Sequence, residues 1–281
     1  MTQTTESRTL PGPAQAPRDR RIAYMPTAFL QGTLPYHDPG SLAVWQRSMY
    51  GVSLRVEAAT GLGLPYGLYP RLMLAWVASE VLRTGSPDLR LGRDARTFAG
   101  SLGIDNPSSG QAGSLTRLRD QMRRLFGAMI TVTRVADGGE APPAAAIWQT
   151  GEGFSEEPIG SSLSLNESFY REVAEHSAPL DLDCLYGLRS SPLSLDLYAW
   201  LTWQFSFTRV PRSFTWAQLQ AQFGSQAVAE KKFRELWKAA LGRVLIEYPA
   251  AKIDVGARKV ILRPSPTSVP RSRPRVAVEE D

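Results

Sequence analysis

Residues 113–134 read Gly113-Ser-Leu-Thr-Arg-Leu-Arg-Asp-Gln-Met-Arg-Arg-Leu-Phe-Gly-Ala-Met-Ile-Thr-Val-Thr-Arg134. On a helix, the apolar side chains of the first part fall within one arc of about 100°: Leu115, Leu118, Met122, Leu125 and Phe126. The opposite side is mostly cationic and presents Arg117, Arg123 and Arg124, with Arg119 and Gln121 at its edges. Ser114 is the expected N-cap, and the β-branched residues at 130–133 predict a strand directly after the helix.

A second stretch, beginning at residue 227, repeats this design. Its expected helix has an apolar face and, opposite to it, the cations Lys231, Arg234 and Lys238; residues 244–248 then read as a strand. The segments upstream of the two basic helices also correspond. Residues 70–76 resemble 192–200, and residues 97–103 resemble 216–224. The chain therefore contains two copies of one pattern of elements.

The shared order is helix, short strand, helix ended by glycine, basic helix and β ribbon, which is the order of a winged helix. We therefore expect an α+β fold, mainly helical, with two tandem winged-helix modules that carry β-hairpin wings. The first wing is expected to pair residues 129–135 with 146–149. The second is expected to pair 252–255 with 258–262 and to expose Lys252, Arg258 and Lys259. Arginine suits such a surface because its planar fork grips phosphate or the guanine edge.

Composition suggests how the domains are arranged. Residues 1–20 and 264–281 are rich in Pro, Ser and Arg and predict a disordered tail and a flexible tail. Between them we expect an N-terminal winged-helix domain over 21–160 and a C-terminal one over 161–263. By residue count the net charge is +5 for 67–136, −8 for 137–192 and +6 for 193–264. Basic modules are drawn to nucleic acid, and the acidic segment between them would avoid DNA or contact a partner or a second protomer.

Several kinds of chemistry have no support in the sequence. There is no Gly-Lys pair, and so no Walker A loop. One cysteine, Cys184, and two distant histidines, His37 and His176, give neither a zinc site nor the paired histidines of a metal-dependent nickase. We expect no enzymatic activity, no catalytic residues, no metal and no cofactor. The absence of a long apolar run predicts no membrane span, and the single cysteine favours a reducing cytoplasm.

Three segments carry a resemblance to a known family. Residues 64–76 (Leu-Pro-Tyr-Gly-Leu-Tyr-Pro-Arg-Leu-Met-Leu-Ala-Trp), residues 116–126 and residues 193–202 resemble the plasmid-encoded RepA family of bacterial replication initiators. The likeness extends over about residues 22–262. It implies an origin-binding protein that recognises repeated sites on its plasmid and recruits the host initiator and replicative helicase. No binding residue is carried over from the family.

The leading hypothesis is a plasmid replication initiator that binds repeated double-stranded DNA sites and is not an enzyme. One alternative is a winged-helix transcriptional repressor, including a repressor of its own gene. Another is a protein-interaction scaffold whose basic helix faces are simply solvated. The DNA site and the formation of a homodimer are left open.

Overall fold

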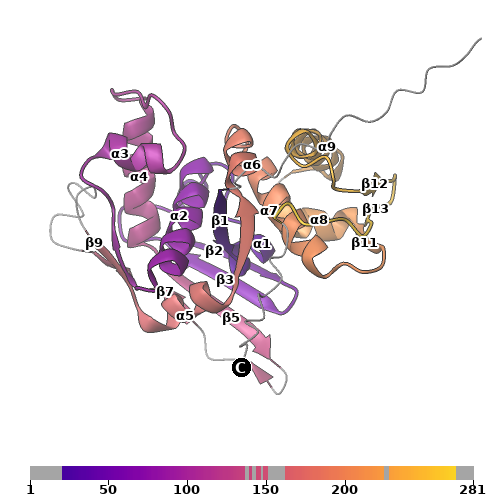
Figure 1. Cartoon of the computed structure of the whole chain (residues 1–281), viewed down its shortest axis with the longest axis horizontal. Helices are drawn as coiled ribbons and strands as arrows, with labels where there is room; N and C mark the ends of the chain where they lie inside the picture. Colours follow the sequence, from indigo (N-terminus) through magenta and orange to yellow (C-terminus); the bar gives the residue numbers. More distant parts are fainter. Residues whose placement is uncertain are drawn as a thin grey trace, which may run out of the picture.

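The computed structural model describes residues 21–136, 139–140, 144–146, 148–150, 162–224 and 228–269. The expected tail at 1–20, most of the acidic segment between 137 and 161, and residues 270–281 lie outside them. Helices and small antiparallel sheets alternate along the described chain (Figure 1). The expected α+β class is confirmed.

The N-terminal unit, as we call residues 68–165, contains three helices and a three-stranded sheet. The helices are α2 (Leu68–Thr84), α3 (Ala95–Ser101) and α4 (Ser114–Gly127), and the strands are β4 (Asp88–Arg90), β8 (Trp148–Thr150) and β9 (Ser162–Leu165). The strands lie in the order β4-β9-β8. Asp94 caps α3, because its carboxylate accepts a hydrogen bond of 2.8 Å from the backbone N–H of Thr97.

The C-terminal unit, residues 192–262, has the same connectivity, except that the N-terminal unit has three additional strands, within residues 129–146, after its third helix. It runs through α7 (Pro192–Phe207), β11 (Arg212–Thr215), α8 (Trp216–Phe223), α9 (Glu230–Glu247), β12 (Ile253–Val255) and β13 (Lys259–Leu262). Its strands lie in the order β11-β13-β12. In both units the first strand therefore pairs with the last, and the last pairs with the middle strand. Thr215 opens α8 with a capping box, in which Thr215 and Gln218 bind each other's backbone.

A further, central sheet combines two strands that precede the N-terminal unit with the strands that follow α4. It contains β2 (Val44–Met49), β3 (Val52–Glu57) and β5 (Met129–Ala136), with β7 (Ala144–Ala146) on the far side of β5 and the short β6 (Gly139–Glu140) at the end of β5. Two pairings in its register are Leu54 opposite Val132 and Val56 opposite Ile130. These four side chains are buried, so one face of β3 and β5 belongs to the core.

This sheet corrects the expected first wing. The strand after α4 was predicted to form the wing with residues 146–149. It does pair with the next segment, β7, and Ile130 lies opposite Ala146. However, β5 also pairs with β3, and residues 148–149 belong to β8, which with β9 completes the sheet of the N-terminal unit. The apolar face of β5 accounts for the difference, because Ile130 and Val132 are fully or almost fully buried against the core. A solvated wing strand would not need such a face.

Among the remaining elements, the first described strand pairs with a strand near residue 180. Strand β1 (Ile22–Pro26) pairs with β10 (Ser177–Asp181), and α1 (Thr27–Gln31) follows β1 directly. Helices α5 (Glu167–Glu175) and α6 (Leu182–Gly187) flank β10. Residues 177–187 thus form a strand and a helix.

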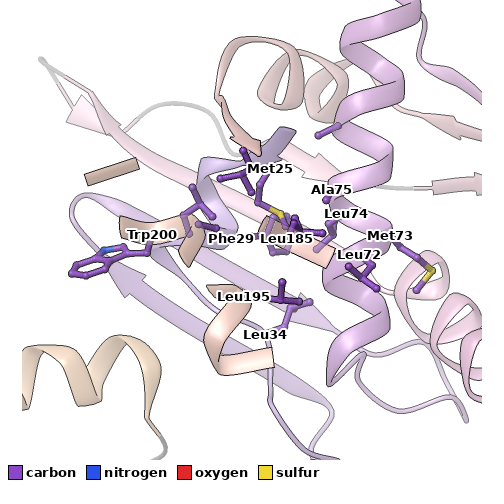
Figure 2. Close-up of a cluster of buried hydrophobic side chains, with 14 of the residues drawn as sticks. Met25, Phe29, Leu34, Leu72, Met73, Leu74, Ala75, Leu185, Leu195 and Trp200 are labelled. Carbon is purple, nitrogen blue, oxygen red and sulfur yellow. The ribbon is translucent and has the colours of Figure 1, made fainter. Parts of the chain in front are cut away.

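One hydrophobic core runs through both units. Figure 2 shows the part of this core to which β1, α1, α2, α6 and α7 contribute. Met25, Leu72, Leu185, Leu195 and Trp200 are among the side chains drawn. The expected boundary between residues 160 and 161 falls before β9, which pairs with β4 of the N-terminal unit. The sheet of the N-terminal unit therefore crosses that boundary.

Residues 264–269 are part of the folded structure. The buried Ser268 hydroxyl lies 2.8 Å from the Tyr198 hydroxyl and 3.2 Å from that of Thr202, both on α7. Tyr248 also donates a hydrogen bond to the carbonyl of Pro266. The expected flexible tail from residue 264 is therefore wrong for its first six residues, which are fixed by hydroxyl groups distant in sequence.

The turn after α3 has little room for a side chain. Gly103 has φ of +71°, and a Cβ built there would lie 2.5 Å from Cε1 of Tyr186. We expect Gly103→Ala to lower the free energy of unfolding by about 1–3 kcal/mol, from backbone strain and from the displaced ring. Urea denaturation measures the change.

The matched control is Gly100→Ala in α3, where nothing lies within 4 Å of the added Cβ. Alanine favours helix over glycine by up to about 1 kcal/mol, so this variant should be no less stable than the parent. Equal stability of the two variants would contradict the close approach of Tyr186.

Candidate nucleic-acid interface

Helix α4 buries the expected apolar face. Leu115, Leu118, Met122, Leu125 and Phe126 are at most 7% exposed. Gly113, rather than the expected Ser114, is the N-cap, because the chain becomes helical one residue earlier. The Ser114 hydroxyl accepts a hydrogen bond of 2.8 Å from the backbone N–H of Ser108 and thereby fastens the preceding loop.

Among the arginines of α4, Arg117 is exposed. It lies near Tyr69 of α2: burial raises the pKa of Tyr69, and the positive charge of Arg117 opposes this rise. Arg119 and Arg123 are half-buried, and neither is without a partner. Arg117 is therefore the cation of α4 that the structure leaves most open to a ligand.

Arg124 holds α4 to the loop before α2. Its side chain is 18% exposed, its Nε lies 3.0 Å from Oδ2 of Asp120, and its guanidinium carbon lies 5.3 Å from the centre of the Tyr66 ring. These contacts use both its charge and its flat face. The structure thus gives Arg124, an expected DNA-binding residue, a role inside the fold.

Gln121 is also an internal residue, being only 3% exposed. Its Oε1 accepts a hydrogen bond of 2.9 Å from the backbone N–H of Tyr66, and its Nε2 donates one of 3.0 Å to Asp120. The expectation that Gln121 contacts DNA is wrong for this conformation. On the helical wheel Gln121 lies at the border of the apolar arc. At such a position the helical pattern does not determine whether the side chain is buried, because burial depends on tertiary packing.

Helix α9 is longer than expected. Residues 244–247, predicted to begin a strand, form its last turn, since Val244 continues the buried stripe of Phe233, Trp237 and Ala240. Lys231 and Lys238 are exposed and Arg234 is half-buried. The helical period outweighs the strand preference of the β-branched residues here.

Trp216, at the start of α8, makes cation–π contacts with two cations of α9. The guanidinium carbon of Arg234 lies 5.3 Å from the centre of its ring, and Nζ of Lys238 lies 5.9 Å from it. The ring in turn packs edge-on against Trp237 at 5.5 Å. Arg234 also donates a hydrogen bond to Glu230. The aromatic pair thus holds two positive charges side by side on the outer surface of α9.

The hairpin β12–β13 carries the expected cations of the second wing. Lys252, Arg258 and Lys259 are exposed, and none forms an ion pair with a residue that the structure describes. The acidic side chain between them, Asp254, is instead paired with Arg263 at 2.6 Å. This ribbon therefore presents uncompensated positive charge.

The start of α3 carries two of the exposed cations that were not part of the expected set. Arg93 and Arg96 flank the N-cap Asp94 at the start of α3. Their signal in the sequence was their position beside a helix N-cap, where backbone N–H groups also attract anions. The basic surface of the N-terminal unit thus includes the start of α3 as well as α4.

The two basic surfaces lie apart. In Figure 1, α3 and α4 lie toward one end of the longest axis, while α9, β12 and β13 lie toward the other, with α1, α2 and α7 between them. Among the described residues, no three His, Cys, Asp or Glu side chains gather as metal ligands would. No helix in the described part of the chain is both long and apolar enough to span a bilayer.

These features define a protein with two units of the same connectivity, each presenting cations on its third helix. A family model described as plasmid encoded RepA protein matches residues 64–218, which is more than half of the chain. The chain belongs to this family of plasmid-encoded replication proteins.

The chain is similar to a crystal structure of domains 2 and 3 of RctB, with 12% sequence identity and a TM-score of 0.48, over 85% of this chain and 97% of that one. No curated protein matches the sequence.

Proposed function

We propose that this chain initiates plasmid replication by binding specific double-stranded DNA sites at its origin, without enzymatic activity of its own. The observation that carries the proposal is the repeated unit: helix, strand, two helices and two further strands, with the strands in the same spatial order in both copies. In the first copy β5, β6 and β7, which belong to the central sheet, are inserted between α4 and β8. This is the connectivity of a winged helix, which uses its third helix to read the major groove. Membership of the plasmid-encoded RepA family supports the proposal.

In this proposal α4 and α9 enter the major groove and the second wing lies along the backbone. Arg117 is the principal base-reading candidate in α4, with Arg119 and Arg123 beside it, and Lys231, Arg234 and Lys238 serve in α9. Lys252, Arg258 and Lys259 neutralise phosphates, as do Arg93 and Arg96. Phosphate contacts position a protein on the duplex, whereas groove contacts select the sequence.

The partners implied by the family resemblance complete the proposal. Once bound to its origin, the protein would bring in the host initiator and the replicative helicase. A titration on DNA flanking the gene, against shuffled DNA of equal length, tests the first step. We expect a preference of roughly a thousandfold or more, with a steep loss of affinity as salt rises. Equal and weak binding to both DNAs would reject the initiator and the repressor alike and favour the scaffold.

The base-reading role of Arg117 has its own test. We expect Arg117→Ala to weaken the specific site by about 1–3 kcal/mol and to relax the preference at one base pair, because a bidentate contact to guanine would be lost. Competition binding with singly substituted sites measures this change.

The control for Arg117 is Arg171→Ala in α5, whose arginine is exposed and already paired with Glu167 at 2.7 Å. It should leave affinity unchanged. An equal loss on specific and shuffled DNA after Arg117→Ala would assign this arginine to a phosphate instead, and no loss at all would remove α4 from the interface.

A further inference from the structure

In each unit, an arginine from outside the unit binds backbone carbonyls at the end of the second helix or in the turn just after it. The last carbonyls of a helix have no partner within it and carry partial negative charge, so a cation placed there stabilises the helix end. The segment after this end leads to α4 in one unit and to α9 in the other. A group that holds the helix end therefore also holds the start of the following helix.

Arg189 holds the turn that follows α3 of the N-terminal unit. It lies between α6 and α7, and its Nη1 donates to the carbonyl of Gly103 and lies 3.2 Å from Oδ2 of Asp105. Tyr186 donates a second hydrogen bond, of 3.1 Å, to the carbonyl of Ser101. The end of α3 is thus fixed by residues more than eighty positions further along the chain.

Arg47 closes α8 of the C-terminal unit. It lies on β2 of the central sheet, and its Nη1 and Nη2 donate to the carbonyls of Ala221 and Gly224. Gln222, between these two, is fully buried; its Nε2 donates to the carbonyl of Leu30 at 2.8 Å, and its own carbonyl accepts from Thr33 at 3.1 Å. Residues from the N-terminal part of the chain therefore hold the end of α8.

A third link joins the first helices of the two units. Arg71 of α2 and Asp196 of α7 form two parallel hydrogen bonds of 2.8 Å, and both side chains are buried. The three links lie on three different pairs of elements. Rotation of one unit against the other would break at least one of them, and each break would leave charge or carbonyl groups unpaired.

We propose that Arg47 and Arg189 are positioning residues that hold α4 and α9 at one separation and one rotational phase, so that the protein binds a bipartite duplex site of fixed spacing. This proposal rests on the proposed function, because it assumes that both helices contact the same DNA. It goes beyond that function by assigning the spacing of the site to two side chains that do not touch DNA.

The test begins with the wild-type protein on its footprinted site, with 5 or 10 base pairs inserted between the two protected segments. Five base pairs turn one segment about half a turn around the axis, and ten restore the phase but lengthen the site by about 34 Å. For a rigid protein we expect both insertions to lower affinity on the order of a hundredfold, because only one unit can bind at a time. Recovery of affinity at ten base pairs would overturn the proposal.

The variants Arg47→Ala and Arg189→Ala, checked for folding by circular dichroism, are then measured on the same DNAs. We expect each to bind the native spacing about tenfold more weakly, and the ratio between native and altered spacings to fall from on the order of a hundred to roughly ten or less. A general loss of stability would instead weaken all spacings by the same factor, and that result would overturn the proposal.

Lysine variants test the geometry of the two arginines separately, because lysine keeps the positive charge but has a single side-chain nitrogen. One nitrogen of Arg189 makes both of its contacts, so Arg189→Lys should keep the spacing preference. Arg47 serves two carbonyls with two nitrogens, so Arg47→Lys should not keep it. The matched control is Arg55→Ala on β3 of the same sheet, whose arginine pairs only with sheet neighbours Glu57 and Gln46. If the wild type shows no preference for its own flank, the proposed function itself fails, which is a different result from an unchanged spacing ratio in the variants.

Discussion

Replacing Asp196 by alanine will lower the free energy of unfolding by about 3–5 kcal/mol, because it leaves the guanidinium of Arg71 buried without its counter-charge. Arg71 is 3% exposed and is surrounded by α2, α7 and the loop around Leu34. Its remaining hydrogen bonds go to the carbonyls of Leu34, Pro35 and Gly67. Carbonyl oxygens alone do not replace the solvation of a full positive charge.

Urea denaturation followed by tryptophan fluorescence measures this effect. The control is Asp183→Ala, which removes an ion pair with Arg21 of similar length, 2.6 Å, whose side chains are 63% and 62% exposed. Its midpoint should move little, because water replaces an exposed partner. A midpoint for Asp196→Ala close to that of the control would mean that the pair does not hold α2 against α7.

A double variant distinguishes the cost of the unpaired charge from the cost of the lost hydrogen bonds. Arg71→Met with Asp196→Leu removes both charges and should recover part of the lost stability. The recovery should be incomplete, because the carbonyls of Leu34, Pro35 and Gly67 lose their donor. A double variant less stable than Asp196→Ala alone would contradict the cost assigned to the unpaired charge.

Removing the cations of the second wing will have the largest effect on DNA binding. In the triple variant Lys252→Gln, Arg258→Gln and Lys259→Gln, we expect specific and shuffled DNA to be bound on the order of a hundredfold more weakly at about 0.15 M salt. Each phosphate contact contributes about 0.9 to the slope of log K against log salt, so the slope should fall by about 2.7. Fluorescence anisotropy between about 50 and 200 mM salt measures both quantities.

The control for this variant is Arg243→Gln on α9. Arg243 is exposed like the wing residues, but on the helical wheel it lies across the buried stripe from Lys231 and Lys238. It should leave the slope unchanged. A larger loss on specific than on shuffled DNA in the triple variant would show that the wing reads bases, and an unchanged slope would remove the wing from the phosphate contacts.

The sequence could predict most elements of this fold. The apolar arc of α4 is a local feature, and its five side chains are buried as the helical wheel predicts. The repeated order of elements was visible because both units need the same local signals. The positions of exposed cations such as Arg117, Lys231 and Lys259 could also be predicted from the local pattern of polar and apolar residues.

Other features could not be read from the sequence because they depend on distant partners. Strand β5 has the composition of a wing strand, yet it pairs with β3, more than seventy residues earlier. Gln121 and Arg124 belong to a basic helix face, yet Tyr66 and Leu64 engage them from the loop before α2. In both cases the competing partner lies outside any local window.

The sequence by itself determined the two repeated units, their basic helices and the family to which the chain belongs, because helical period, capping and charge act over a few residues. The tertiary structure alone decided which of the basic residues remain open and how the units are joined. Arg71 meets Asp196 across 125 positions, and Arg47 meets Ala221 across 174. Such pairs are selected by the packing of the whole core, since burying a charge is favourable only where its partner is already fixed in place.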